Sequence, residues 1–259
     1  VTKAPCGHPK IAQAMLDGGA VDLGEARITN VKRLRRAGIT TPITLICTPI
    51  LSQADRVVRG CSTSHNSEME VIARLAEAAR KAKLVHHIML MVELGDMRDG
   101  IMPENVAAIA RQVAAMPGVK LRGIGANFAC LSGMAPDAAK MKDLSTIASD
   151  TERAHGSLIR VISGGNSANL PWALGAHSST RINNLRLGEA ILLGVEPVSG
   201  DKISGLFTDA FTLVTEVIEA KVKPVPAKVK FTNPALKELH LVPDNIRAIR
   251  SIIAIGKQD

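Results

Sequence analysis

Short apolar runs alternate with longer amphipathic stretches along most of the chain. Residues 86–94, HHIMLMVEL, form a nearly continuous apolar run, which is typical of a strand buried on both faces of a parallel sheet. The next stretch, 102–118, spaces its apolar residues as a helix does, begins at Pro103 and stops at Pro117 and Gly118. The pattern therefore predicts a repeating unit of one buried strand and one helix.

This unit recurs through the larger part of the chain. Another helix is predicted at 67–83, where Ser67 and Glu70 have the spacing of a capping box. Eight such units close most naturally into a (β/α)8 TIM-type barrel, here with a truncated first strand, and a doubly wound open sheet is the alternative. The predicted strands are 1–3, 20–25, 43–49, 61–66, 86–94, 119–128, 159–165 and 182–188.

The pattern changes near residue 205. Residues 206–225 are rich in Thr, Val, Ile and Phe in rough alternation, and 249–259 contain a further strand. We therefore predict a barrel domain over 1–204 and the beginning of a C-terminal β-domain over 205–259. The stretch 224–243 fits neither element, and we expect both ends of the chain to be cut back relative to a longer protein.

Composition and charge narrow the possible partners. The net charge is +8, but the basic residues are dispersed, aromatic residues make up only 2% and tyrosine is absent, which argues against nucleic-acid binding. The positive charge suits an anionic small molecule or a phosphate-bearing cofactor. No apolar run is long enough to span a membrane, and we see no secretory signal pattern. Four cysteines without zinc-type spacing indicate reduced thiols, so we expect a cytoplasmic protein without membrane, nucleic-acid or metal partners.

Polar residues gather where the predicted strands end. In a barrel of parallel strands the carboxyl ends form the active-site face, so these residues are the candidates for chemistry. The strand bodies, in contrast, are apolar. The polar positions at the strand ends are Lys3, Glu25, Asn66, the 95–100 loop, Asn127, 163–167 and 186–189.

Two glycine-rich segments follow the last two predicted strands. Backbone N–H groups at the start of a helix, together with the Ser167 hydroxyl, can bind an anion. One such segment could simply form a tight turn, but two at neighbouring strand ends match the phosphate site common in barrels. We therefore predict a phosphate site formed by Ser167 and the backbone at Gly188, with Ser163 as a further cofactor-binding residue.

Lys3 becomes significant beside this predicted site. If the barrel closes, its amine lies at the mouth of the first strand, next to the last one. A lysine amine forms a Schiff base with a carbonyl, and the aldehyde of pyridoxal 5'-phosphate is the obvious partner. Burial would lower the pKa of that amine and help it act as a nucleophile and proton carrier. An exposed lysine on a frayed terminus is the alternative.

Two arginines complete the predicted chemistry. Arg186 stays cationic, so beside a pyridine ring it can only donate to an unprotonated nitrogen, which favours proton removal and return at Cα. Pairing in a salt bridge at the barrel rim is its alternative role. Arg98, in the loop ELGDMRDG, offers a fixed fork for a substrate carboxylate or the cofactor phenolate, unless it pairs with Asp96 or Asp99 at the surface.

Several of these segments together resemble the alanine-racemase-like, fold-type III enzymes that use pyridoxal 5'-phosphate, and most of all the racemases of the ornithine racemase type. The resemblance implies a barrel followed by a β-domain, in a head-to-tail homodimer that acts on a free amino acid. It also implies that Lys3 carries the cofactor and that Arg186 faces the pyridine nitrogen. Ser167 and the backbone at Gly188 and Glu189 would then contact the phosphate, with Gly165 and Asn166 beside them. The resemblance further implies that Arg98 lies near the substrate carboxylate and that Asn127 replaces a histidine. The segments that carry the resemblance are VTKAPCGHPKIAQAML, VDLGEARITNVKRL, NSEMEVI, HHIMLMVELGDMRDGI, GIGANFACLSG, VISGGNSANL, LRLGEAILLG and IIAIGKQD.

The chain also departs from strict alanine racemases. Lys257 stands where those enzymes have a tyrosine that acts as the second base, so the second base is Lys257, Cys6, His8 or a residue beyond Asp259. The leading hypothesis is an amino-acid racemase in which Lys3 and Lys257 exchange the Cα proton on opposite faces. A basic substrate such as ornithine would place its distal ammonium near Asp96, Asp99 or Glu93. The alternatives are a non-catalytic carrier of the cofactor with the same barrel, and an aldolase or decarboxylase.

Overall fold

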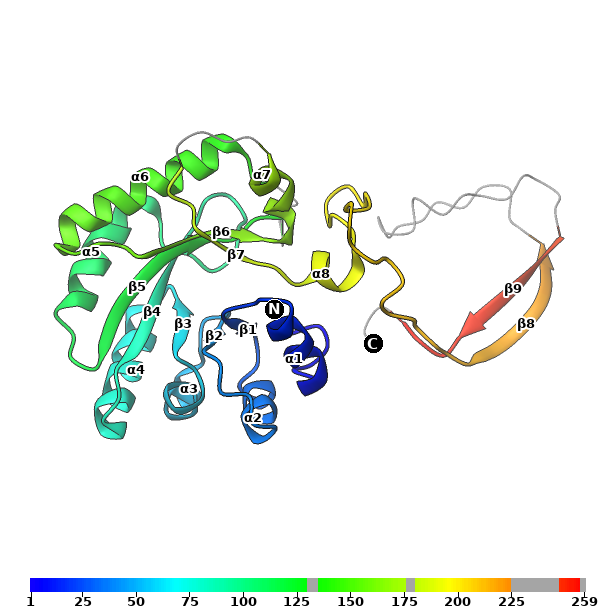
Figure 1. Cartoon of the computed structure of the whole chain (residues 1–259), viewed down its shortest axis with the longest axis horizontal. Helices are drawn as coiled ribbons and strands as arrows, with labels where there is room; N and C mark the ends of the chain where they lie inside the picture. The colour runs from blue at the N-terminus through cyan, green and yellow to red at the C-terminus, as the bar shows by residue number, and fades with distance from the viewer. Residues whose placement is uncertain (130–134, 176–179, 225–246, 257–259) are drawn as a thin grey trace. The chain divides into compact units, whose positions relative to one another are not determined.

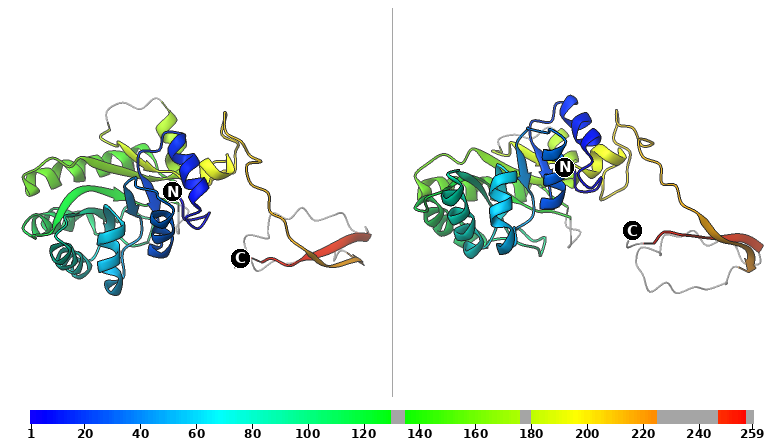
Figure 2. Two further views of the ribbon diagram at one scale, coloured as in Figure 1. Left: turned by 60° about the horizontal axis from the view of Figure 1, so that its bottom comes forward. Right: turned by 90° about the horizontal axis from the view of Figure 1, so that it is seen from below.

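The computed structural model describes residues 1–129, 135–175, 180–224 and 247–256 of the 259-residue chain. The chain divides into two compact units, Val1–Ala210 and Phe211–Asp259. The first unit contains seven parallel strands that neighbour one another in sequence order and curve into a nearly closed barrel with helices outside (Figures 1 and 2). The predicted barrel is confirmed, and the open sheet is excluded.

The strands of this sheet are β1 (Leu23–Glu25), β2 (Ile43–Leu45), β3 (Thr63–Asn66), β4 (His86–Val92), β5 (Val119–Ala126), β6 (Val161–Asn166) and β7 (Asn184–Arg186). The helices are α1 (Pro9–Asp17), α2 (Ile28–Arg36), α3 (Ala54–Gly60), α4 (Met69–Ala82), α5 (Pro103–Ala114), α6 (Ala138–His155), α7 (Leu170–Leu174) and α8 (Glu189–Leu193), with the short 3-10 helices η1 (Leu51–Gln53) and η2 (Ser167–Asn169). Strand and helix alternate up to β6 as the apolar pattern predicts.

Burial explains why these segments form their elements. Strand β4 is buried at all positions but one, as expected for a strand covered on one side by helices and on the other by the barrel interior. Helix α4 buries Val71, Ile72, Leu75 and Ala79, which recur at helical spacing along one face. These side chains belong to one continuous apolar core between the strands and their helices.

The predicted capping box of α4 is wrong. The helix begins at Met69 with Glu68 as its N-cap, and no side chain caps its first turn. Ser67 therefore lies outside the helix start, since the backbone turns into helical geometry one residue later than the Ser67 and Glu70 spacing requires. A side-chain cap is present at α6 instead, where Asp137 accepts a hydrogen bond from the backbone N–H of Lys140 at 2.8 Å.

The predicted first strand at residues 1–3 is also wrong, although its residues lie where that strand would be. The backbone N–H of Thr2 donates to Gly24 O at 2.8 Å, and the Val1 nitrogen donates to Leu187 O at 2.6 Å. Residues 1 and 2 thus lie between β1 and the segment that follows β7. Lys3 already belongs to a turn over residues 3–7, which ends at Gly7 with φ of 64°.

The second unit contains an antiparallel pair of strands, β8 (Val217–Pro224) and β9 (Arg247–Ile253). The predicted β-structure of the C-terminal region is therefore present, in a shorter form than 206–225 and 249–259. The stretch 224–243, which fitted no predicted element, falls almost entirely outside the described residues. Lys257 also lies outside them. In the described parts of the chain, no helix is both long and apolar enough to cross a membrane.

Candidate active site

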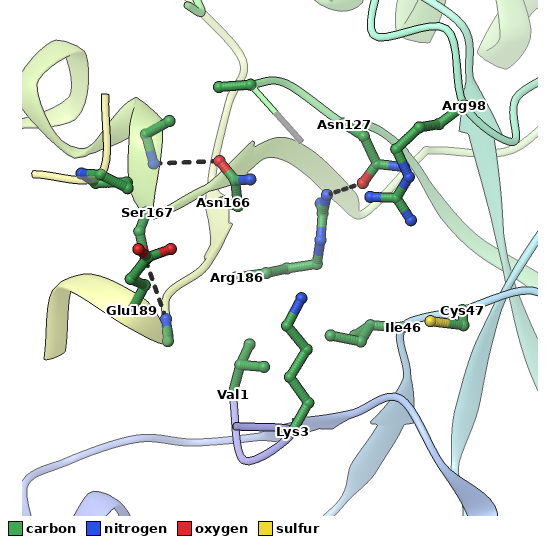
Figure 3. A pocket seen from close by; sticks show the side chains of 14 residues that line it. Val1, Lys3, Ile46, Cys47, Arg98, Asn127, Asn166, Ser167, Arg186 and Glu189 are labelled. Carbon is green, nitrogen blue, oxygen red and sulfur yellow. Dashed lines mark hydrogen bonds between the residues drawn. The ribbon is translucent and has the colours of Figure 1, made fainter. Parts of the chain in front are cut away.

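A cavity of about 580 Å³ opens at the carboxyl ends of the barrel strands, within the first unit. That volume is in the range of sites that bind a small-molecule cofactor together with a substrate. Its walls come from segments far apart in the sequence, and Figure 3 shows them converging. The predicted site residues that line it are Lys3, Arg98, Asn127, Asn166, Ser167, Arg186, Gly188 and Glu189.

The Lys3 side chain extends from its turn into this cavity, toward Arg186 (Figure 3). The residue is exposed, in contrast to the buried amine considered from the sequence. The reason is local, since Lys3 stands in a turn after the edge contact of Thr2 and is not enclosed between two strands. Its amine is therefore accessible to a molecule that enters the cavity.

Arg186 ends β7 and is held in a fixed orientation by neutral oxygen atoms. Its Nη2 donates to Ala126 O at 2.8 Å and to Asn127 Oδ1 at 2.9 Å, and its Nη1 donates to Ser163 Oγ at 2.5 Å. The Ser163 hydroxyl in turn donates to Asn184 Oδ1 at 2.7 Å. Ser163 does not line the cavity, so its contact is with the guanidinium behind the cavity wall.

The two glycine-rich segments meet at Ser167. The backbone N–H groups of Gly188 and Ala190 both donate to Ser167 Oγ at 3.2 Å, which joins the start of η2 to the start of α8. A Cβ at Gly188 would lie 3.0 Å from Val1 Cβ, so any larger residue there would require Val1 to shift. The predicted convergence of the two segments is present in the structure.

Asn166 and Gly165 shape the turn that carries Ser167. Asn166 Nδ2 donates to Phe128 O at 2.9 Å, and Asn166 Oδ1 accepts from the Ala168 N–H at 3.1 Å. Gly165 has φ of 107°, and a Cβ there would lie 2.8 Å from the Phe128 ring. Gly165 lies outside the cavity lining, so its contribution is to the backbone path.

Arg98 lies on a loop that closes around a carboxylate. Glu93 Oε1 accepts from the N–H groups of Gly95 at 2.5 Å and Met97 at 3.2 Å, and Oε2 accepts from the Arg98 N–H at 3.1 Å. Met97 has φ of 58°, an unusual conformation for a residue with a side chain, which these bonds sustain. The Glu93 carboxylate thus holds the loop and is already occupied by backbone donors.

The three acids considered for a distal ammonium do not line the cavity. Glu93 is engaged as described, Asp96 is buried, and Asp99 accepts from Thr48 Oγ1 at 2.9 Å and lies 3.6 Å from Arg98 Nη2. Among the residues that the structure describes, the acid that lines the cavity is Glu189, which the sequence indicated only as a backbone contact to phosphate. Because Gly188 was already a predicted site residue, the position of Glu189 directly after it could have indicated that its side chain reaches the cavity.

The charges of the cavity favour an anionic occupant. Lys3, Arg98 and Arg186 supply three cationic side chains, against one carboxylate among the described residues that line it. Cys47 also lines the cavity, and burial raises the pKa of its thiol while Arg98 partly opposes that shift. His65 on β3 is buried, and burial together with Arg186 keeps its pKa well below the usual value, so the imidazole is neutral.

Among the described residues, the donor set fits pyridoxal 5'-phosphate. A lysine amine, a guanidinium that lines the cavity and a hydroxyl that accepts from two backbone N–H groups match its aldehyde, ring nitrogen and phosphate in kind. No group of three or more His, Cys, Asp or Glu side chains that could hold a metal ion occurs in the same described parts. Cys6 and His8, two candidates for the second base, are exposed and do not line the cavity.

Two known racemases are related to this chain in sequence. The lysine racemase of Thermotoga maritima is 34% identical over 260 residues, covering 100% of this chain and 72% of that protein. The ornithine racemase of Acetoanaerobium sticklandii is 30% identical over 261 residues, with 100% and 73% covered.

Solved structures show the same fold. An alanine racemase from Clostridium difficile 630 has a TM-score of 0.63 and 21% identity, with 82% of this chain and 57% of that chain covered. PipY of Synechococcus elongatus, solved with pyridoxal phosphate bound, has a TM-score of 0.58 and 20% identity, with 70% and 86% covered. The family model for the alanine racemase N-terminal domain matches residues 1–197, and this chain belongs to that family.

Proposed function

We propose that this protein is a pyridoxal 5'-phosphate-dependent racemase of basic amino acids, with ornithine and lysine as the first candidates. The observation that carries the proposal is the convergence of Lys3, Arg186, Arg98 and the Ser167–Gly188 contact on one cavity. The relatives that match the whole chain are a lysine racemase and an ornithine racemase, which supports the substrate class.

The protein's contribution begins with binding. Ser167 and the backbone at Gly188 and Glu189 would hold the phosphate at the start of α8, with Ser167 kept in place by the hydrogen bond that its Oγ accepts from the Gly188 N–H. Arg186 would donate to the ring nitrogen, and its hydrogen bonds to Ser163, Ala126 and Asn127 keep the guanidinium in place. The cofactor, when bound to an amine, supplies the electron sink that makes the substrate Cα–H bond acidic.

Proton transfer then falls to the chain's own bases. Arg98 would bind the substrate carboxylate and so orient Cα relative to the Lys3 amine. Lys3 removes the Cα proton on one face, and a second base returns a proton on the other. Lys257 is our candidate for that base, with Cys6, His8 or a residue beyond Asp259 as alternatives.

Glu189 is our candidate for the distal ammonium of a basic substrate. It is the carboxylate that lines the cavity among the described residues, and it stands apart from the occupied Glu93 and Asp99. A carboxylate that faces an ammonium distinguishes ornithine from a neutral amino acid of equal length.

The wider organisation remains part of the proposal. Residues 1–204 form the cofactor-binding barrel, and residues 205–259 begin a C-terminal β-domain. The protein acts on free amino acids in the cytoplasm as a homodimer with shared active sites, without nucleic-acid or membrane partners.

The test is an assay on single enantiomers. The protein, supplied with pyridoxal 5'-phosphate, is incubated with L-ornithine, L-lysine or L-alanine, and the products are separated by chiral chromatography. We expect the D-enantiomer to form from ornithine or lysine, and Lys3→Ala to abolish both this activity and the Schiff-base absorbance near ~420 nm. A cofactor band without loss of optical purity would favour a non-catalytic carrier, and a chemically different product would favour an aldolase or decarboxylase.

A further inference from the structure

Lys3 owes its position to its neighbour, Thr2. That residue is completely buried, whereas Lys3 is exposed. The backbone N–H of Thr2 donates to Gly24 O at 2.8 Å, and its side-chain hydroxyl donates to Glu25 Oε2 at 2.9 Å. The residue that precedes the amine is therefore tied to β1 through both its backbone and its side chain.

Glu25 itself is a fully buried carboxylate with several neutral donors around it. Its Oε1 accepts from the N–H groups of Ala26 at 2.8 Å and Arg27 at 3.3 Å, and from Asn30 Nδ2 at 3.2 Å. Thr2 supplies the donor on the other oxygen. Because a buried carboxylate without its donors is costly, Glu25 strongly favours the arrangement in which Thr2 and Asn30 both contact it.

The same cluster also fixes the far end of the Lys3 turn. The Gly7 N–H donates to Thr2 O at 2.9 Å, which closes the turn back onto Thr2. A Cβ at Gly7 would lie 2.8 Å from Asn30 Cβ, so the turn packs directly against the residue that Glu25 holds. The turn that carries Lys3 is therefore tied to Thr2 and packs against Asn30, and both of these residues donate a hydrogen bond to Glu25.

We propose that Thr2 and Glu25 are positioning residues for Lys3, and that their hydrogen bond fixes the amine at the distance that proton transfer needs. The inference rests on the proposed function, since it assigns Lys3 to the chemistry. Neither residue lines the cavity, so the pair acts through the backbone of the turn and not by contact with a ligand. A displacement of about 1 Å in a reacting group can cost up to ~100-fold in rate.

The test compares three substitutions. Thr2→Val removes the hydroxyl and keeps the side-chain shape, whereas Thr2→Ser keeps the hydroxyl. Thr44→Val is the matched control, since Thr44 Oγ1 also donates to a carboxylate, Asp22 Oδ2 at 3.2 Å, away from the cavity lining. For each variant kcat, KM, urea unfolding and the titration of the Schiff-base absorbance with pyridoxal 5'-phosphate are measured.

We expect Thr2→Val to lower kcat by at least ~10-fold with KM changed less than ~3-fold, because the amine is displaced while the substrate contacts remain. Thr2→Ser and Thr44→Val should both stay within ~2-fold of the wild-type kcat. Equal kcat in Thr2→Val and Thr44→Val, or an equal loss in Thr2→Ser and Thr2→Val, would overturn the proposal. If Thr2→Val does not fold, Thr2→Ala removes the same hydroxyl and is judged by the same criteria.

Glu25→Gln tests whether Glu25 acts through its hydrogen bonds or through its negative charge. A glutamine can still accept from Ala26, Arg27 and Asn30 and can donate to Thr2 Oγ1, while the Thr2 proton turns to Gly24 O, which lies at 3.3 Å. We expect kcat within ~3-fold of wild type, and a loss as large as that of Thr2→Val would contradict a positioning role. If the wild type racemises nothing, the proposed function fails. The positioning of Lys3 is then still tested by the titration of the Schiff-base absorbance with pyridoxal 5'-phosphate, which should be weaker in Thr2→Val than in Thr44→Val.

Discussion

Arg186 and Arg122 both lie on barrel strands, but their surroundings differ. Arg186, at the carboxyl end of β7, donates to three neutral oxygen atoms and lines the cavity. Arg122, on β5, donates to Thr63 Oγ1 at 2.7 Å and lies 3.6 Å from Asp22 Oδ2, away from the cavity lining. The arginine at the carboxyl end of the barrel therefore faces the cavity, whereas the arginine toward the amino-terminal half of the barrel is paired with a carboxylate within the fold.

The comparison predicts that substitutions at the two ends have opposite signatures. At the carboxyl end, activity should fall while the folded state persists. Substitutions in the amino-terminal half of the barrel should lower the free energy of unfolding, while each folded molecule keeps its activity.

Arg98→Ala should have the largest effect. Its loss removes the fork that binds the substrate carboxylate, so kcat/KM for ornithine should fall by ~100-fold or more, mainly through KM. The urea midpoint should change little because Arg98 is at the cavity and its loop is held by Glu93. An Arg98→Ala enzyme with unchanged KM would remove Arg98 from the substrate site.

Acid should weaken the amino-terminal half through His86. Burial lowers the pKa of His86 from 6.5 to about 4. Between these two pH values the unfolded chain therefore binds a proton at His86 and the folded protein does not. Stability is fully present above pH 6.5 and is lost as the pH falls toward about 4, by up to ~3 kcal/mol. Urea unfolding at several pH values measures this loss.

His86→Gln provides the control for that pH dependence. Glutamine does not titrate and can still reach Ser64 Oγ, which lies 2.9 Å from His86 Nε2. The decline with acid should be smaller in this variant, with a remainder from His65, whose pKa is also lowered by burial. Identical pH profiles for the variant and the wild type would rule out His86 as a source.

Arg122→Met should affect stability alone. It keeps the apolar stem but leaves Thr63 and Asp22 without their cationic partner, which we expect to cost ~2 kcal/mol of unfolding free energy. The kcat of the folded fraction should equal that of the wild type. A loss of kcat without a loss of stability would contradict the expected difference between the carboxyl end and the amino-terminal half of the barrel.

Glu189→Gln should have the smallest effect and refine the substrate class. We expect kcat/KM for ornithine to fall by ~10-fold, while that for norvaline, a neutral amino acid of similar length, should stay within ~2-fold. Equal losses for both substrates would instead place Glu189 at the cofactor.

Much of this fold was predictable because buried strands and amphipathic helices leave periodic patterns, as at β4 and α4. The cavity residues Lys3, Arg98 and Arg186 could also be predicted, since strand ends meet on one face of a barrel. The failures concern contacts without periodicity. Nothing in the sequence indicates that Glu93 binds its own loop, because that depends on a turn in which Met97 has φ of 58°.

The predicted strand at residues 1–3 illustrates a second limit. A strand is defined by repeated pairing, and residues 1 and 2 make single backbone contacts with Gly24 and Leu187. Sequence pattern could place them next to β1 but could not show that the turn at Lys3 begins immediately afterwards. That turn is what exposes the amine and makes the Thr2–Glu25 contact important.

Borohydride reduction of the holoprotein provides the most direct test of the central claim. Reduction converts a Schiff base into a stable secondary amine, and peptide mass spectrometry then identifies the lysine that carries the pyridoxyl group. We predict that the modification occurs on Lys3. A pyridoxyl group on another lysine, with Lys3 unmodified, would contradict the account.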